Sequence, residues 1–357
     1  MPDLLQDFLQ AYIYYFQKQD FRSAEKVCEQ IIDTAPHQVE AVYLLGLCMC
    51  RMDNPEIGIQ LIEEAVVLKP ELEVYDFQKE SLVQQGVTNI ADLLEARFQM
   101  YLQHQSINAF LISYPKCGRT WLRLLFGKYV IGEGGKESPL EVLELTRANP
   151  EFSSLEITHD DYPHWIPVDK LFTDKRAYVG KKVIFLVRDP RDVLVSNYFQ
   201  YTKRKDMEKI GDIFGDNLSA FIRHNIGGLR SVVAFYNVWA ENRAVPEDFI
   251  LVTYEDMIKD ARKVFSGCLE FLGWPKRPDA FIDEVVDYGR FDNMRKLEET
   301  NAFNSARLKP PEDGDPEGFK MRKGKVGGYV DYMSEDDIVY VNDYLAANLD
   351  DYYGMYK

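Results

Sequence analysis

The sequence contains no apolar run of 18 or more residues, which argues against a membrane-spanning helix. The first seven residues, Met1 to Asp7, hold neither a basic segment nor an apolar one, so they predict no secretory signal peptide. We therefore expect a cytoplasmic protein without a membrane partner.

Cysteine is scarce, with five residues in a chain of 357, and no two of them form a C-x-x-C pair. An odd number of scattered thiols is typical of free cysteines in a reducing compartment and not of a disulfide framework. The spacing indicates no zinc site, and we expect no metal. The cysteines are Cys28, Cys48, Cys50, Cys117 and Cys268.

Positive charge is in deficit, because 42 basic residues face 58 acidic ones and the net charge is −16. This disfavours nucleic acid and other polyanions as partners. The deficit is uneven: residues 1–106 hold 7 basic and 17 acidic residues, a net −10, which leaves −6 for the rest. The basic motifs described below are therefore local patches on an acidic body. That pattern suits a small anionic cofactor and a neutral or cationic small molecule.

The first 70 residues repeat themselves with a period of 34. They are rich in helix formers, and their apolar residues follow a helical spacing. Pro36 and Pro70 are 34 positions apart, as are the small residues Ala24 and Gly58. Small residues recurring at this period are typical of tetratricopeptide (TPR) repeats, in which paired helices cross closely.

We predict two TPR-like repeats at 4–37 and 38–71, and a third, degraded helix pair at 72–105. Two repeats are too few for independent stability, so this region is expected to pack on the rest of the chain, on a second copy or on a protein partner. The alternative is a plain helical extension with no partner. We expect a domain boundary between residues 105 and 106.

A short loop between an apolar strand and a helix forms the first candidate anion site. The strand is predicted at 109–113, and a helical pattern begins at Trp121. The loop between them carries Lys116 and Thr120. Free N–H groups at a helix N-terminus, together with the helix dipole, attract an anion to this position. The loop lacks the Walker A spacing.

A second candidate follows the apolar run 183–187, which predicts a buried parallel strand. Arg188 lies at its carboxyl end, where open α/β sheets bind ligands. Asp189 and the proline after it predict a helix start, with the aspartate as N-cap. The alternative is a structural ion pair between Arg188 and Asp189 or Asp192.

The third candidate is the segment 322–329, which contains three cations and three glycines in eight residues. Such a loop lets its backbone approach an anion closely. A solvated basic turn is the alternative.

In this order, the three segments resemble the cytosolic-type sulfotransferase family, which uses 3′-phosphoadenosine-5′-phosphosulfate (PAPS). In that family a Y-P-K-S-G-T-T-W loop grips the 5′-phosphosulfate, and R-x-P-x-D-x-x-V-S and R-K-G-x-x-G segments grip the 3′-phosphate. The resemblance covers about residues 107–357. It implies an α/β fold with a P-loop-like parallel sheet in three layers, a catalytic domain at 106–357, and adenosine-3′,5′-bisphosphate (PAP) as product.

The resemblance also implies which residues bind the cofactor. Lys116, Arg188, Arg322 and backbone N–H groups supply the positive charge, so we expect no metal in this site. Cys117 stands where the family usually has Ser and Arg119 where it has Thr, but backbone N–H groups survive both changes, and Arg119 adds a guanidinium suited to phosphate. Trp121 and Phe291 are flat rings suited to holding adenine. The implied cofactor residues are Lys116, Cys117, Gly118, Arg119, Thr120, Trp121, Arg188, Ser196, Tyr254, Phe291, Met294, Arg322, Lys323 and Gly324.

Sulfuryl transfer needs a base for the acceptor proton and a cation for the leaving phosphate oxygen. Lys116 is the expected cation. The family carries its base in a K-T-H segment, which the resemblance matches to 157–159 and therefore to His159. Ile157 stands where the family has the lysine. His164 and Glu156 are rival bases.

The acceptor is expected to be a small molecule that carries a hydroxyl or a nitrogen. Aromatic residues near the base and the second motif are candidates for its pocket wall. The segment 298–321, rich in Pro, Gly and charge, is expected to form a lid. Two other functions stay open from the sequence: an ATP-dependent kinase, and a TPR scaffold with an inactive domain. The candidate wall residues are Tyr162, Trp165, Phe199 and Tyr201.

Overall fold

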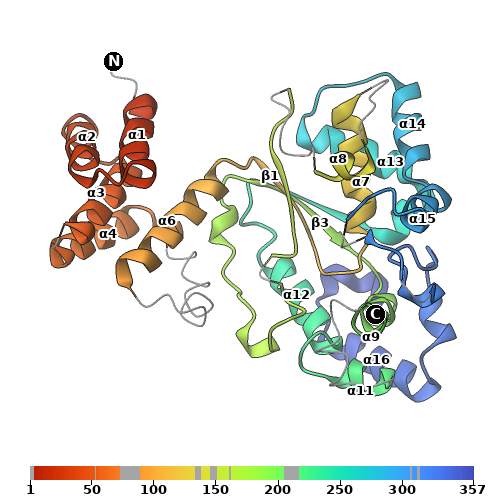
Figure 1. Ribbon diagram of the computed structural model, residues 1–357. Helices are drawn as coiled ribbons and strands as arrows, with labels where there is room; N and C mark the ends of the chain where they lie inside the picture. Colours follow the sequence, from red (N-terminus) through yellow and green to blue (C-terminus); the bar gives the residue numbers. More distant parts are fainter. Residues whose placement is uncertain are drawn as a thin grey trace. The chain divides into compact units, whose positions relative to one another are not determined.

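The computed structural model describes residues 4–52, 54–72, 89–132, 138–144, 151–160, 162–204, 217–305, 308–311 and 314–357. The chain forms two compact units. The first comprises Met1–Ser106 together with Asp174–Ala177, and the second comprises Ile107–Thr173 and Tyr178–Lys357. Figure 1 shows the elements of both units, coloured along the chain.

The secondary structure of the first unit, within its described residues, consists of helices joined by short turns. Local signals explain where its helices begin: the Asp20 side chain accepts a hydrogen bond from the Ser23 N–H, and a proline occupies the first turn of the fourth helix. The elements are α1 (Leu4–Tyr12), a π-helical turn (Ile13–Gln17), α2 (Phe21–Thr34), α3 (Val39–Arg51), α4 (Pro55–Leu68) and α6 (Ile90–Gln105).

Helices α3 and α4 cross closely at two glycines. A Cβ atom on Gly58 would lie 2.5 Å from the Gly46 carbonyl oxygen, so the crossing requires glycine at position 58. Ala24, one predicted period earlier, is fully buried. Two helix pairs thus occupy the two predicted repeats, and the TPR assignment itself stays a prediction. The first half of the predicted third pair lies outside the described residues.

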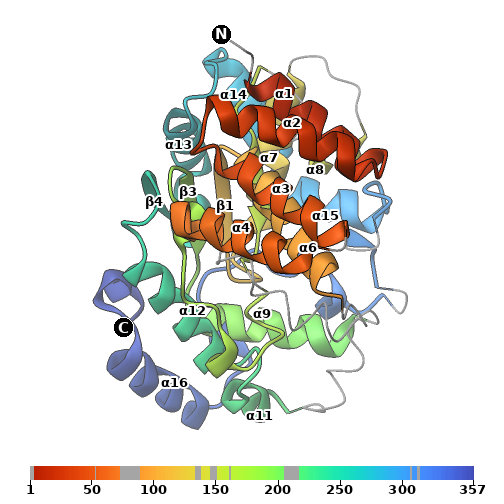
Figure 2. The same ribbon diagram turned by 90° about the vertical axis from the view of Figure 1, so that its left-hand side faces the viewer.

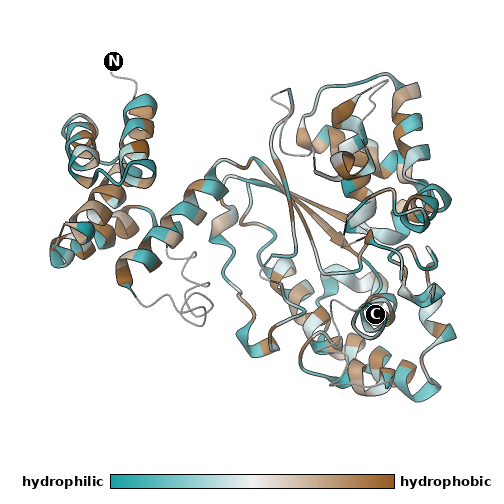
Figure 3. Ribbon diagram, viewed as in Figure 1, coloured by the Kyte–Doolittle hydropathy of each residue, from teal (hydrophilic) through white to brown (hydrophobic). Residues whose placement is uncertain are grey.

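The second unit is built on a parallel sheet of four strands in the order β2-β1-β3-β4. All five residues of β1 are buried, and most of β3 is buried too, as expected for strands covered on both faces. Figure 3 shows these strands near the hydrophobic end of its scale. The strands are β1 (Ala109–Ser113), β2 (Leu155–Thr158), β3 (Lys182–Val187) and β4 (Asp248–Thr253).

Helices cover both faces of this sheet, so the unit has three layers (Figures 1 and 2). No helix in the described part of the chain is both long and apolar enough to span a membrane. One layer contains α7 (Arg119–Ile131), α8 (Pro139–Glu144), α13 (Tyr254–Leu272) and α14 (Asp279–Tyr288), and the other contains α9 (Pro190–Lys203), α11 (Leu218–Arg223), α12 (Leu229–Glu241) and α16 (Glu335–Asn348).

The remaining helical elements are short, apart from α15, and connect the layers. They are α15 (Phe291–Glu299) and the 3₁₀ turns Val168–Lys170, Arg176–Tyr178, Pro316–Gly318, Gly328–Asp331 and Asp351–Tyr356.

The parallel strands bring their carboxyl ends to one edge, and the first two predicted motifs directly follow β1 and β3. The strand predicted at 109–113 is confirmed, and the one at 183–187 is confirmed with Lys182 added. Helix α9 begins at Pro190 with Asp189 as its N-cap, also as predicted. Helix α7 begins at Arg119, two residues before the expected start, because Gly118 takes the left-handed conformation of its N-cap.

Candidate active site

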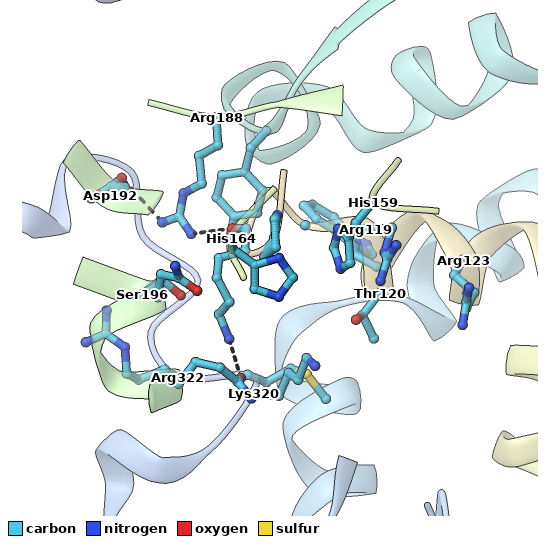
Figure 4. Close-up of a pocket in the computed structure, with 18 of the residues that line it drawn as sticks. Arg119, Thr120, Arg123, His159, His164, Arg188, Asp192, Ser196, Lys320 and Arg322 are labelled. Carbon is cyan, nitrogen blue, oxygen red and sulfur yellow. Dashed lines mark hydrogen bonds and ion pairs between the residues drawn. The ribbon is translucent and has the colours of Figure 1, made fainter. Parts of the chain in front are cut away.

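A cavity of about 850 Å³ opens at the carboxyl edge of the sheet. Figure 4 shows the side chains of several motifs turned into it. Residues from all three predicted motifs line it, together with the candidate base and most of the expected aromatic wall. The predicted residues found there are Lys116, Gly118, Arg119, Thr120, Trp121, His159, Tyr162, Trp165, Arg188, Ser196, Tyr201, Tyr254, Phe291, Met294, Arg322, Lys323 and Gly324.

The first motif presents the N-terminus of α7 to the cavity. Gly118 has φ +98°, and a Cβ atom there would lie 2.7 Å from the Tyr254 ring. No side chain among the described residues caps this helix. The first-turn N–H groups therefore face the space where an anion would be held, and Lys116 and Thr120 line the same space.

Cys117 does not line the cavity. Its side chain is fully buried, with Sγ 3.4 Å from the Tyr236 hydroxyl, and burial raises the pKa of the thiol to about 12. Only the backbone of this predicted residue can serve an anion.

Arg188 faces the cavity and also forms an ion pair. Its guanidinium lies 3.3 Å from the Asp192 carboxylate and 4.2 Å from the centre of the Tyr254 ring, and it donates to the Lys325 carbonyl oxygen at 2.9 Å. Asp189 instead pairs with Arg191 at 2.8 Å. The structural ion pair that the sequence left open thus forms with Asp192, and Arg188 also lines the cavity.

Asp192 joins the second motif to the third, a link that the sequence analysis missed. Its carboxylate is 3% exposed and accepts hydrogen bonds from the Gly327 N–H at 2.9 Å and the Tyr329 N–H at 3.0 Å. These bonds hold the glycine-rich loop beside Arg188.

Arg322, in the third motif, is held in position by two hydrogen bonds and one aromatic ring. It donates to the Glu317 carboxylate and to the Tyr332 hydroxyl, each at 2.7 Å. Its guanidinium lies 4.7 Å from the centre of the Phe199 ring. Phe199 is therefore behind Arg322 and is not among the residues that line the cavity, so it forms no part of the wall.

Gly324 and Phe291 are in close contact on the cavity wall. Gly324 has φ +60°, and a Cβ atom there would lie 2.5 Å from the Phe291 ring. This contact requires glycine for two reasons, the backbone conformation and the space.

His159 follows β2, and its hydrogen bond fixes which ring nitrogen carries the proton. The Nδ1 atom lies 2.9 Å from the Ser113 carbonyl oxygen, which can only accept, so Nδ1 donates and Nε2 keeps its lone pair. Burial lowers the pKa of His159 well below 6.5, and the positive charge of Arg119 lowers it further. The imidazole is therefore neutral near pH 7.

The two rival bases also line the cavity. His164 is 7% exposed, and burial lowers its pKa to about 3. Its ring centre lies 5.5 Å from that of His159. Glu156 precedes them on β2. The geometry brings all three candidates together and does not choose among them.

Lys116 has a backbone φ of +73°, and its Nζ atom donates to the Gln200 side-chain oxygen at 3.0 Å. Burial lowers the pKa of its ammonium well below 10.5, and the nearby charges of Lys320 and Arg204 lower it further. An anion bound here would favour the charged form of the lysine.

Sequence reasoning also missed other residues of the wall. A helical period starting from Ser196 would have found those on α9, because they share one face of the helix. Lys320, Met321 and Arg123 had no comparable signal. The α9 residues are Ser196, Asn197, Gln200, Tyr201 and, just past the end of the helix, Arg204. Among the described residues, no group of three or more His, Cys, Asp or Glu side chains could hold a metal ion.

Comparison with known proteins decides the family. The family model described as the sulfotransferase domain matches residues 106–353. The chain belongs to the sulfotransferase family. This sulfotransferase is 33% identical over 251 residues to a 3-beta-hydroxysteroid sulfotransferase of Cavia porcellus, covering 62% of this chain and 77% of that protein. It is 29% identical over 236 residues to Sulfotransferase 2A6 of Mus musculus, covering 63% and 78%.

This sulfotransferase is also similar to a crystal structure of mouse sulfotransferase SULT7A1 complexed with PAP. The match covers 68% of this chain and 84% of that chain, with 20% sequence identity and a TM-score of 0.48. The predicted enzyme class is confirmed by the family match, and so is a sulfotransferase fold on a four-stranded parallel sheet.

Proposed function

We propose that this sulfotransferase transfers the sulfuryl group of PAPS to a hydroxyl or nitrogen of a small-molecule acceptor. One observation carries the proposal. The neutral imidazole of His159, the ammonium of Lys116 and the N-terminus of α7 all face one cavity. A base, a cation and an anion cradle are the groups that this reaction requires.

The residues present fit the cofactor in two places. The 5′-phosphosulfate would be held by the α7 N-terminus with Lys116, Gly118, Arg119 and Thr120. The glycine-rich loop, fixed to Arg188 through Asp192, would hold the 3′-phosphate. The other 3′-phosphate residues are Ser196, Arg322, Lys323 and Gly324, and the adenine would lie against Trp121, Tyr254, Phe291 and Met294.

In the proposed step, His159 accepts the acceptor proton at Nε2, the nitrogen that its bond to Ser113 leaves available. The acceptor atom forms its bond to sulfur as the bond from sulfur to the 5′-phosphate oxygen breaks. The electron pair of that bond goes to the phosphate oxygen, and the Lys116 ammonium stabilises the charge there. His164 and Glu156 are the alternatives for the base.

The charge of the cavity restricts the range of acceptors that it can bind. Among the described lining residues, nine are basic and two, Glu156 and Asp192, are acidic. This favours a neutral acceptor over a cationic one, with Tyr162, Trp165 and Tyr201 as its apolar wall. The name of the Cavia porcellus relative, a 3-beta-hydroxysteroid sulfotransferase, supports a hydroxyl as the accepting group. The basic residues are Lys116, Arg119, Arg123, Arg188, Arg204, Lys320, Arg322, Lys323 and Lys325.

Titration calorimetry tests the proposal through the 3′-phosphate. Wild-type protein should bind PAP, and Arg188→Ala should weaken that binding by about 1.5–3 kcal/mol, the range for a hydrogen bond to a charged group. The same variant should bind adenosine 5′-monophosphate, which lacks the 3′-phosphate, as well as the wild type does. Arg290→Ala, on a side chain that is 73% exposed, is the matched control. Equal losses for both nucleotides would contradict the assignment of Arg188.

For the helical unit, we propose a TPR-like domain at residues 1–105 attached to a cytoplasmic catalytic domain at 106–357. Its role would be to bind a second copy or a protein partner. The ATP-dependent kinase considered from the sequence has no support in the family match. A scaffold with an inactive domain predicts no binding of PAP, so the titration above also tests that alternative.

A further inference from the structure

Strand β2 places no cationic side chain beside the position where the sulfuryl group would be transferred. At the end of this strand, the cavity is lined by Glu156, Ile157 and Thr158, and the Ile157 side chain is 6% exposed and apolar. The sulfuryl group and the phosphate beside it each carry negative charge. The positive charge that stabilises these two groups must therefore come from other elements of the fold.

Lys320 reaches this space from the segment that precedes the glycine-rich loop. Lys320 lines the cavity with Lys116 and His159, and Figure 4 labels it among the lining residues. Along the chain, Lys320 is far from both the loop after β1 and the end of β2.

The main chain of Lys320 is fixed by a buried carboxylate. Glu298 is completely buried and accepts the Lys320 N–H at 2.7 Å and the Met321 N–H at 2.9 Å. Arg204 lies 3.5 Å from the same carboxylate and balances its charge. This clamp sets where the Lys320 side chain begins, independently of what the side chain itself contacts.

The electrostatic effects of Lys320 agree with such a position. Its charge is among the causes that lower the pKa values of Lys116, His159 and His164. Lys116 follows β1 and the two histidines follow β2, so a charge that acts on all three lies near the carboxyl ends of both strands.

We propose that Lys320 is a catalytic residue that contacts the sulfuryl oxygens of the cofactor. The proposal rests on the function proposed above. Lys320 would neutralise charge on the sulfuryl group as it passes from the 5′-phosphate oxygen to the acceptor, while Lys116 serves the departing oxygen and His159 takes the proton.

Two ligands that differ only in the sulfuryl group test the proposal. PAPS carries that group and PAP does not. Titration of the full chain with both should show that Lys320→Ala weakens PAPS binding about tenfold, as expected for a lost hydrogen bond to a charged group, and changes PAP binding by less than about twofold. Lys320→Arg, which keeps the charge, should restore most of the PAPS affinity. Lys296→Ala removes an exposed lysine of α15 outside the cavity and should bind both ligands like the wild type.

The outcomes separate the two proposals. Wild-type protein that binds neither ligand overturns the proposed function. A wild type that binds both, with a Lys320→Ala variant that binds PAPS as tightly as the wild type, overturns the role of Lys320 alone. Equal losses for PAPS and PAP also overturn it, because Lys320 would then serve the nucleotide. If Lys320→Ala melts at a lower temperature than the wild type, Lys320→Met keeps the aliphatic chain, and the same comparison of ligands decides the matter.

Discussion

Replacing Gly324 by alanine should displace the Phe291 ring from the cavity wall. The added Cβ atom would lie 2.5 Å from the ring, whereas carbon atoms in contact are about 3.5–4.0 Å apart, so the ring has to retreat by about 1 Å. The substitution also places alanine at φ +60°, which costs about 1–2 kcal/mol of folding free energy by itself.

The effect on cofactor binding follows from the proposed role of Phe291. Stacking of a base on an aromatic side chain contributes about 1–3 kcal/mol, so loss of the ring position should raise the dissociation constant of PAP by about 5- to 150-fold. Titration calorimetry measures this change directly, and thermal melting measures the cost in stability.

Gly180→Ala is the matched control, because it separates the backbone cost from the clash. Gly180 has φ +69°, and nothing lies within 4 Å of a Cβ atom added there. The control should lose similar stability and keep its affinity for PAP. The reasoning is refuted if Gly324→Ala binds PAP as tightly as Gly180→Ala does.

Three further predictions concern the base, its pKa and the helical unit. His159→Ala should lower turnover about 100-fold or more while PAP affinity stays near normal; full turnover in this variant with a large loss in Glu156→Gln would show that the base is misassigned. Arg119→Thr removes a charge that lowers the pKa of His159, so that pKa should rise, and the acidic fall of kcat/KM should move to higher pH than in the wild type; an unchanged pH profile would contradict this coupling. Deleting residues 1–105 should lower the melting temperature, because Ala177 of the retained chain packs against the core of those helices; an equally stable, fully active truncated protein would contradict this expectation.

Local signals predicted the main elements around the site. The apolar run 109–113 became β1, and Asp189 capped α9 as its type and its following proline indicated. Parallel strands then placed the ends of β1, β2 and β3 at one edge. The site could be predicted to this extent because short-range chemistry determined each element and one topological rule assembled them.

The residues that sequence reasoning missed depend on contacts between distant segments. Asp192 accepts from the Gly327 N–H, 135 positions away, and Glu298 fixes Lys320 through the backbone. Nothing local distinguishes these carboxylates from solvated ones. Phe199 was placed in the acceptor wall because it is aromatic and near the motif, but the face of α9 that lines the cavity carries Ser196 and Gln200, and Phe199 points behind Arg322.

The buried thiol of the first motif has a practical consequence for chemical reactivity. A cysteine beside a helix N-terminus and a lysine is ordinarily acidic and readily alkylated or oxidised. Cys117 occupies such a place in the chain, yet its sulfur is sealed behind the loop against Tyr236, and its raised pKa keeps it protonated. This sulfotransferase should therefore keep its activity in the presence of iodoacetamide or mild peroxide, and its assays need no reducing agent to protect the phosphate loop.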